Sequence, residues 1–488
     1  MSQDILLLEP QSLWNNFSKL NAVPRASKKE ERVIQFMKDF GHSLGLETIV
    51  DHIGNVIIKK PATAGMENKQ TVVLQSHLDM VHQKNNDTQF DFDTEGIKMF
   101  IEDDWVKARG TTLGADNGIG VATIMALLES KDIDHPPLEA LFTIDEETGM
   151  TGALELKGGL LNADIMLNLD TEDDNELTIG CAGGIDITAV GSYSLKETPI
   201  NKSSSIKLEL KGLTGGHSGM DIHLGRGNAN KLMNRLLYTI SKSFNYYLHS
   251  IDGGGLRNAI PRESVAHISF DIEYEVELLS KINQIFDEIK KEYLTTDPDI
   301  KLEINKSTPG SHYTESGFCK QFLKACYTCH NGIYRMSPDV EDLVQTSNNM
   351  ARVLVNNGSY EILCLTRSSV DSEKMDLVDS ISSSFELIGA SVNTSGSYPG
   401  WTPNPNSDIV KIMTNIYRER FDEMPHVNAC HAGLECGILG TNYPEMDMIS
   451  FGPNIRGAHS PDEKVQISSV QKYWGYLLDT LQQIPDKN

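Results

Sequence analysis

The sequence predicts an α/β domain built on a mixed sheet, split in the chain by an inserted α+β domain. First, short apolar runs alternate with helical stretches in the first part of the chain. Second, from about Ser192 the runs become alternating strands in a different order. Third, a chain of 488 residues is too long to fold around one ordinary hydrophobic core. We expect residues 1–190 and 398–488 to form the α/β domain and residues 191–397 the inserted domain.

Each apolar run of the first part ends in acids or a histidine. Val72–Leu74 leads to His77-Leu-Asp79, and residues two apart in an extended chain point to the same side. Leu138–Ile144 leads to Asp145-Glu146-Glu147, and Ile165–Leu169 leads to Asp170. Ligands bind at the carboxyl ends of strands in open α/β sheets, so these ends predict one polar site.

A glycine-rich turn, Gly110–Gly120, leads into an apolar helix expected over Val121–Leu128. Asp116 lies near the start of this helix, where a carboxylate is favourable. The turn resembles a phosphate-binding loop, but it lacks the lysine and hydroxyl of that motif and carries an acid instead. We therefore disfavour nucleotide binding.

Flanking elements complete the α/β domain. Ser27 and Glu30 match a capping box before a helix ending near Leu44, and Glu47–Lys60 reads as a hairpin turning at Gly54. The remaining expected elements are a hairpin-like segment over Phe90–Arg109, a helix over Ser407–Arg420, a strand over Met446–Phe451 and a helix over Ser468–Gln482.

A β-α-β-β pattern recurs in the inserted segment and suggests a duplicated α+β domain. The expected strands are Ser205–Leu210, Leu256–Ile260, Ser264–Tyr274, Ile300–Ile304, Ala351–Val355 and Tyr360–Arg367, and the expected helices are Asn228–Lys242, Glu277–Glu292, Gly317–Tyr327 and Ser372–Phe385.

Composition excludes several classes of partner. The net charge of −25, from 43 basic and 68 acidic residues, disfavours nucleic acid and anionic membranes. No apolar run approaches transmembrane length, and the N-terminus lacks a basic segment followed by a cleavage site. Seven cysteines, an odd number, show no disulfide framework. We expect a cytoplasmic protein.

Five strand-end and loop groups suit a pair of divalent cations, most naturally zinc, with cobalt or manganese as substitutes. Two dications carry four positive charges and three carboxylates supply only three negative charges, so a hydroxide can complete the site. This hydroxide can attack a carbonyl. Asp116 is the natural bridge between the cations, Asp79 can orient His77, and Glu146 can act as general base. The alternative is that these acids only solvate strand ends. The five proposed ligands are His77, Asp116, Glu147, Asp170 and His459.

The ordered motifs H-x-D, G-A-D-N-G, D-E-E-T-G, N-L-D, G-G-H-S-G and A-H-S-P-D-E resemble the co-catalytic zinc peptidases of the carboxypeptidase G2 and aminoacylase type. Val23-Pro-Arg25 and H-A-G-L-E-C-G resemble the aminoacyl-histidine dipeptidase branch. The resemblance implies the five metal ligands with Asp116 bridging, Glu146 as base, and Asp79 orienting His77. It also implies a zinc-exopeptidase catalytic domain with an inserted lid (dimerisation) domain, and a homodimer.

Four further residues are candidates for substrate binding. The resemblance implies that His217 stabilises the carbonyl oxygen, whereas the simpler alternative is a turn residue. Arg367 can clamp a substrate carboxylate or form a strand-end salt bridge. Asn258 and Glu435 are expected to line the substrate site.

Two cysteine motifs suggest other cofactors but are disfavoured. Cys326, Cys329 and His330 match haem-attachment spacing, yet no export signal accompanies them, and we expect packed thiols on a helix. Cys430 and Cys436 near His431 lack a fourth zinc ligand, so we expect them to be buried small hydrophobes.

Taken with the resemblance, the sequence predicts hydrolysis of unblocked dipeptides, preferentially Xaa-His such as carnosine. The alternatives are a carboxypeptidase, tripeptidase or deacylase on the same scaffold, or a binding protein without activity. The intact Glu146 disfavours a binding protein.

Overall fold

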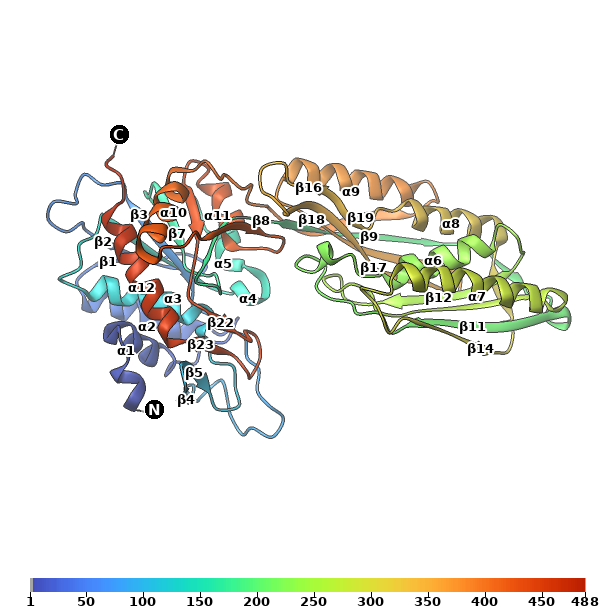
Figure 1. Ribbon diagram of the computed structural model, residues 1–488, viewed down its shortest axis with the longest axis horizontal. Coiled ribbons are helices and arrows are strands. Elements are labelled where there is room, and N and C mark those ends of the chain that lie inside the picture. Colours follow the sequence, from blue (N-terminus) through green and yellow to red (C-terminus); the bar gives the residue numbers. More distant parts are fainter. Residues whose placement is uncertain (1–2, 488) are drawn as a thin grey trace. The chain divides into compact units, whose positions relative to one another are not determined.

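The structure, a computed structural model, describes residues 3–487 as two compact units (Figure 1). The first unit comprises Met1–Gly180, Pro403–Ala429 and Leu434–Asn488, and the second comprises Cys181–Thr402 and Cys430–Gly433. These boundaries differ from the ones expected from the sequence, 190/191 and 397/398. The shift at the first boundary arises because β9 (Gly183–Ser192) pairs with strands of the second unit.

An eight-stranded mixed sheet forms the centre of the first unit, in the order β1-β2-β6-β3-β7-β21-β8-β20. Four neighbours, β6, β3, β7 and β21, are parallel, so their carboxyl ends meet at one edge. The α/β prediction with a mixed sheet is confirmed. The strands are β1 (Glu47–Val50), β2 (Val56–Lys60), β3 (Val72–His77), β6 (Leu138–Thr143), β7 (Ile165–Asn168), β8 (Glu176–Cys181), β20 (His426–Cys430) and β21 (Asp447–Ser450).

Four helices share a hydrophobic core with the face of this sheet that carries Val72 and Leu74 (Figure 1). They are α2 (Glu31–Ser43), α3 (Ala115–Glu129), α10 (Asp408–Phe421) and α12 (Ile467–Gln482). Helix α3 is buried nearly all round, which matches its uniformly apolar sequence. Gln75, whose side chain points to the opposite face, contacts Glu435 at the start of α11 (Glu435–Asn442).

A smaller four-stranded sheet, in the order β22-β23-β5-β4, contributes to a second core of the first unit with η1 (Gln3–Leu7) and α1 (Gln11–Leu20). Its strands are β4 (Met99–Glu102), β5 (Trp105–Ala108), β22 (Ile455–Arg456) and β23 (Lys464–Gln466). Two short helices, α4 (Glu146–Gly149) and α5 (Thr151–Glu155), follow β6.

The second unit contains the duplication suggested by the sequence. One copy runs β11-α6-β12-β13-α7-β14 with strand order β14-β11-β13-β12. The other runs β9-α8-β17-β18-α9-β19 with strand order β17-β18-β9-β19, and the first copy is inserted after its first strand. Antiparallel pairing of β12 with β17 joins the copies into one nine-stranded sheet, which also includes β16.

The elements of the two copies agree with most of the sequence-based ranges. They are β11 (Ser203–Lys211), α6 (Ala229–Ile240), β12 (Tyr247–Gly254), β13 (Ser264–Asp271), α7 (Glu275–Glu292) and β14 (Lys301–Lys306), then α8 (Ser316–Thr328), β17 (Val344–Asn356), β18 (Ser359–Ser368), α9 (Asp371–Glu386) and β19 (Ser391–Tyr398). Smaller elements are β10 (Leu195–Glu197), η2 (Ile200–Lys202), η3 (Ile222–Leu224), η4 (Ile272–Tyr274), β15 (His312–Thr314) and β16 (Gly332–Met336).

The predicted capping box is wrong. Helix α2 begins at Glu31 without a side-chain cap. The Ser27 hydroxyl donates instead to Asp79 Oδ2 at 2.8 Å, and Glu30 accepts from the backbone N–H groups of Lys28 and Asp145 at 2.8 and 3.1 Å. Both side chains support neighbouring loops because those loops carry buried polar groups that need partners.

Two other ranges also differ. The strand predicted over Leu256–Ile260 is a turn, with the Ala259 N–H donating to the Leu256 carbonyl at 3.2 Å, and the strand itself is β12. Glycines at the end of β12 and just after it concealed it, since glycine disfavours strands. Helix α3 begins at Ala115 rather than at Val121, so it includes Asp116.

No helix among residues 3–487 combines the length and apolar character that crossing a bilayer requires. These residues include all seven cysteines, and none of them forms a disulfide bond.

Candidate active site

The first unit brings five proposed ligands together at one edge of its main sheet. His77 ends β3, Asp170 follows β7, and Glu147 lies in α4 directly after β6. Asp116 lies in the first turn of α3 with non-helical backbone angles, and His459 lies in the loop between β22 and β23. The strand ends converge because β3, β6 and β7 are parallel neighbours.

Two triads share Asp116. His77 Nε2 lies 3.2 Å from Asp116 Oδ1 and 3.5 Å from Asp170 Oδ1. His459 Nε2 lies 3.2 Å from Asp116 Oδ2 and 3.0 Å from Glu147 Oε2. Within each triad the ligand atoms lie within 4.8 Å of one another. Each Asp116 oxygen therefore faces a different imidazole, the arrangement that a bridging carboxylate needs.

The charges of the site fit cations. Asp116 and Glu147 raise the pKa of His459 to about 11, and burial raises the pKa of Asp170 to about 6. Burial lowers the pKa of His77, but Asp170, Asp116 and Asp79 outweigh it and raise the pKa well above its usual value. Glu147 Oε1 is buried without a hydrogen-bond partner. The excess of negative charge and the unpaired Glu147 oxygen both suit divalent metal ions.

Asp79 positions both the histidine and the acidic turn. Its Oδ1 lies 3.4 Å from His77 Nδ1, and it accepts the N–H groups of Glu146 and Glu147 at 3.0 and 3.2 Å. Burial raises the pKa of Asp79, but hydrogen bonds from His77, Ser27 and Glu146 outweigh it and lower the pKa to about 2. The ionised form thus fixes the ring of His77.

Glu146 lies beside the two triads. One of its carboxylate oxygens lies within 4.8 Å of ligand atoms of His77 and Glu147. Burial, then the nearby carboxylates Asp170 and Glu435, raise the pKa of Glu146 well above its usual value, against the opposing effect of His77. A carboxyl group with a raised pKa can take up and release a proton near neutral pH.

Glu435 is fully buried near this edge. Its Oε2 accepts from Gln75 Nε2 at 2.7 Å and from the Thr143 hydroxyl at 2.6 Å, whereas its Oε1 is buried without a partner. Burial raises the pKa of Glu435 to about 7. An orphaned carboxylate oxygen is an acceptor for a ligand's N–H or ammonium group.

His217 and Arg367 meet in the second unit. His217 Nδ1 accepts the N–H groups of Gly219 and Met220 at 3.2 and 3.0 Å, so the proton of a neutral ring is on Nε2. Burial and Arg367 lower the pKa of His217, which favours that neutral ring. Nε2 lies 3.5 Å from Arg367 Nη2. Both groups are donors, so an anion lying against them can accept a hydrogen bond from each.

Arg367 is buried, being 5% exposed, and forms no ion pair with a carboxylate among residues 3–487. Its Nη1 donates to the Tyr398 hydroxyl at 2.8 Å, and its Nε has no partner. The predicted alternative of a strand-end salt bridge is therefore wrong. Asn258 is exposed, and its carbonyl accepts the Ser218 N–H at 2.7 Å beside the His217 loop.

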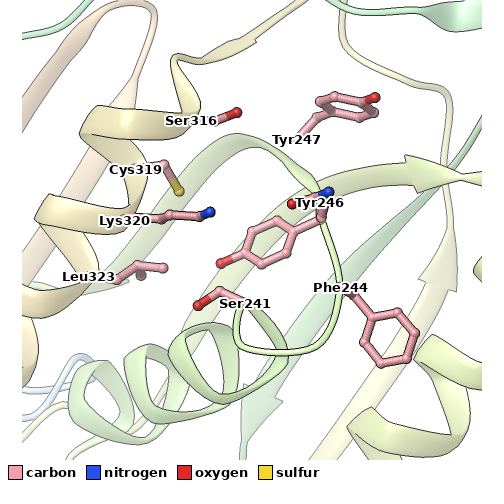
Figure 2. Close-up of a pocket in the computed structure, with 9 residues that line it drawn as sticks. Ser241, Phe244, Tyr246, Tyr247, Ser316, Cys319, Lys320 and Leu323 are labelled. Atoms are coloured by element: carbon pink, nitrogen blue, oxygen red, sulfur yellow. The ribbon is translucent and has the colours of Figure 1, made fainter.

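The second unit also contains a cavity of about 300 Å³ between the end of α6 and helix α8 (Figure 2). Figure 2 shows Cys319, Lys320 and Leu323 of α8 on one side and Tyr246 on the other. Its lining includes no histidine or acid. This cavity therefore lacks the groups needed for the chemistry described above.

Three of the four cysteines in the two motifs are buried, whereas Cys430, also expected to be buried, is only half-buried at the end of β20. Cys326 and Cys329 belong to the hydrophobic core of the second unit, as expected for packed thiols. Cys436 is fully buried. His431 Nε2 lies 2.7 Å from the Ser347 hydroxyl oxygen.

We expect His431 to make the folding stability of the protein sensitive to acid. Burial, reinforced by Arg367, lowers its pKa to about 3, whereas the unfolded value is about 6.5. The unfolded chain binds the proton more tightly, so stability falls as pH drops from about 6.5 towards 3. At pH 5 the loss is up to about 2 kcal/mol. Urea unfolding of metal-free protein should show a shallower pH dependence for His431→Gln; parallel curves would contradict the assignment.

Sequence reasoning missed several residues of the site. Asn117 Nδ2 donates to Asp170, and burial raises the pKa of the neighbouring Glu172 to about 8. Arg25 and Glu463 are buried beside the Asp116 turn. Arg25 lies in the V-P-R motif and Glu463 in the A-H-S-P-D-E motif. Neither motif indicates that its residue contacts the Asp116 turn, which is distant in the chain.

Comparison with known proteins decides the family. The model of peptidase family M20/M25/M40 matches residues 73–483. The chain belongs to this family. It is therefore a hydrolase of a metallopeptidase family.

Individual members of the family are similar over the whole chain. The cytosol non-specific dipeptidase of Escherichia coli is 42% identical over 98% of this chain and 99% of its own. The crystal structure of aminoacylhistidine dipeptidase from Vibrio alginolyticus matches with a TM-score of 0.95 and 43% identity, covering 100% of both chains. Aminopeptidase PepT from Bacillus cereus, at 16% identity, a TM-score of 0.57, and 98% and 99% coverage, shares the fold.

Proposed function

We propose that this metallopeptidase hydrolyses unblocked dipeptides, preferentially Xaa-His such as carnosine, with two Zn²⁺ ions. The dipeptidase activity is supported by the names of two relatives that are similar over nearly their entire length. The histidine preference is supported by the name of one of them. The observation that carries the mechanism is the pair of triads that share Asp116.

One cation would be held by His77, Asp116 and Asp170, and the other by Asp116, Glu147 and His459. Bound zinc polarises a carbonyl and makes water acidic enough to act as a nucleophile. Cobalt and manganese suit the same ligands.

The protein's own groups would move and hold the proton. Asp79 keeps the His77 ring oriented and anchors the backbone of the acidic turn. Glu146, on that turn, would take the proton of the attacking water on its carboxylate and pass it to the leaving amine. Its raised pKa suits this transfer.

The charged ends of the substrate would be recognised separately. The carboxylate of the dipeptide would bind Arg367, with His217 Nε2–H donating to a substrate oxygen. Glu435 Oε1 would accept from the free amino group. Asn258, beside the His217 loop, would line the same substrate site.

Arg367→Lys should lower kcat/KM for a dipeptide by about 10–100-fold, because lysine cannot form the bidentate pair. It should also reduce the preference for the free carboxylate over the C-terminal amide. Arg352→Lys is the matched control, since Arg352 forms an ion pair with the exposed Asp252. An unchanged carboxylate preference would remove Arg367 from the substrate site.

A dipeptide panel, assayed with metal-depleted and metal-restored enzyme, tests the function. We expect cleavage that requires metal, a free amino group and a free carboxylate. Equal cleavage of N-acylated substrates would favour a carboxypeptidase or deacylase, which a carboxylate-binding Arg367 also suits, and cleavage of tripeptides would favour a tripeptidase. No metal-dependent hydrolysis would favour a binding protein.

We propose a cytoplasmic homodimer. The first relative is named as a cytosolic enzyme, which supports the location. The acidic net charge of −25 argues against nucleic acid and anionic membranes as partners, and the names of the two dipeptidase relatives support a small peptide as the substrate.

A further inference from the structure

A buried carboxylate outside the five proposed ligands caps the turn that carries Asp116. Glu463 is 2% exposed and uses both carboxylate oxygens. Its Oε2 accepts the N–H groups of Leu113 and Gly114 at 2.7 and 2.9 Å. Its Oε1 accepts those of Ala115 and Asp116 at 2.7 and 3.2 Å.

Two of these donors, the N–H groups of Ala115 and Asp116, are the first of helix α3, and the other two, of Leu113 and Gly114, belong to the turn that leads into it. The first N–H groups of a helix have no partner within the helix, and a side chain of the N-cap residue usually satisfies one or two. Here the N-cap is Gly114, at φ +70°, which has no side chain to offer. Glu463 supplies the acceptors from a segment about 350 residues further along the chain.

The same segment carries His459. The backbone from Gly457 to Glu463 is a succession of turns, in which Ser460 N–H donates to the Gly457 carbonyl and Glu463 N–H to the Ser460 carbonyl. His459 adopts a left-handed φ of 62° within it. The Glu463 side chain anchors the end of this segment, so His459 and Asp116 are held relative to each other.

Arg25 ties the same turn to the strand end that carries His77. Its Nη2 donates to the Gly114 carbonyl at 2.6 Å, and its Nη1 donates to the carbonyls of Leu78 and Asp79 at 3.1 and 2.9 Å. Glu463 accepts hydrogen bonds from the backbone N–H groups of the turn, and Arg25 donates a hydrogen bond to one of its carbonyl groups. Three ligand-bearing segments are thereby joined through one turn.

We propose that Glu463 is a positioning residue that fixes Asp116 against His459 for cation binding. The inference rests on the proposed metal pair. Glu463 is not itself a ligand here, because both of its oxygens are occupied by backbone N–H groups. Losing a residue that supports metal ligands typically weakens metal affinity 10–100-fold. The effect should be larger for the cation held by His459, Glu147 and Asp116 than for the one held by His77.

Glu463→Gln tests this role with little change in shape. The amide nitrogen would face two N–H donors, so two of the four hydrogen bonds are lost. Asp462→Asn is the matched control, because it removes the same charge from the adjacent, exposed position. Zinc affinities are measured by chelator competition, and thermal unfolding is measured on the metal-free forms.

We expect at least one zinc dissociation constant to rise 10–100-fold in Glu463→Gln and to stay at the wild-type value in Asp462→Asn. Activity should return in part when zinc is raised. Lower stability of the metal-free form with unchanged zinc affinity would overturn the proposal, because Glu463 would then only cap the helix. A wild-type protein that binds no zinc would instead refute the proposed function.

If Glu463→Gln does not fold, Glu463→Asp keeps the charge and shortens the side chain by one methylene. With cobalt in place of zinc, the visible absorption reports ligand geometry directly. An altered spectrum or weaker cobalt binding supports the positioning role, and a wild-type spectrum with wild-type affinity overturns it.

Discussion

Glu146→Gln should reduce kcat for a dipeptide by about 10²–10⁴-fold while the protein stays folded and retains its metal. The amide is nearly isosteric with the carboxylate but cannot take up a proton. The Glu146 backbone N–H still donates to Asp79, so the acidic turn that carries Glu147 keeps its anchor. Steady-state kinetics, with metal content measured on the same sample, gives the result.

The control for this variant is Glu155→Gln, which neutralises an exposed acid in the nearby helix α5. It should leave both kcat and metal content unchanged. Wild-type turnover in Glu146→Gln would remove Glu146 from the proton transfer. Loss of metal together with turnover would make Glu146 a ligand rather than the base.

Asp116→Asn should weaken the binding of both cations by at least about 10²-fold each and abolish turnover without added metal. Each oxygen of Asp116 faces a different histidine, and a neutral amide offers only one oxygen as a ligand. His77→Ala and His459→Ala, in contrast, should each weaken mainly one cation. Equilibrium dialysis followed by metal analysis distinguishes these patterns.

Asp132→Asn, at an exposed position after helix α3, is the control and should bind both cations normally. If Asp116→Asn lost only one cation, Asp116 would be a terminal ligand and the two triads would not share it.

The sequence was sufficient to place the site at one sheet edge because parallel strands deliver their last residues to the same place. His77, Glu147 and Asp170 are each identified by an apolar run that ends in a polar group. The H-x-D spacing also predicted that Asp79 faces His77, and the 3.4 Å separation agrees. Asp116 followed from a glycine-rich turn before an apolar helix.

The supporting contacts were not predictable, because they join segments far apart in the chain. Ser27 and Glu30 satisfy a local capping pattern, yet both bond to loops that a sequence window does not include. The bonds from Glu463 to the α3 turn have no local signature at all. The neutral tautomer of His217 depends on two backbone N–H groups whose directions only the folded turn sets.

Anomalous diffraction at the zinc edge from crystals of the zinc-loaded protein shows whether Asp116 bridges a pair of cations. We expect two peaks, one among His77, Asp116 and Asp170 and the other among Asp116, Glu147 and His459, with one Asp116 oxygen directed at each. A single peak, or peaks that do not share Asp116, would contradict this bridging role.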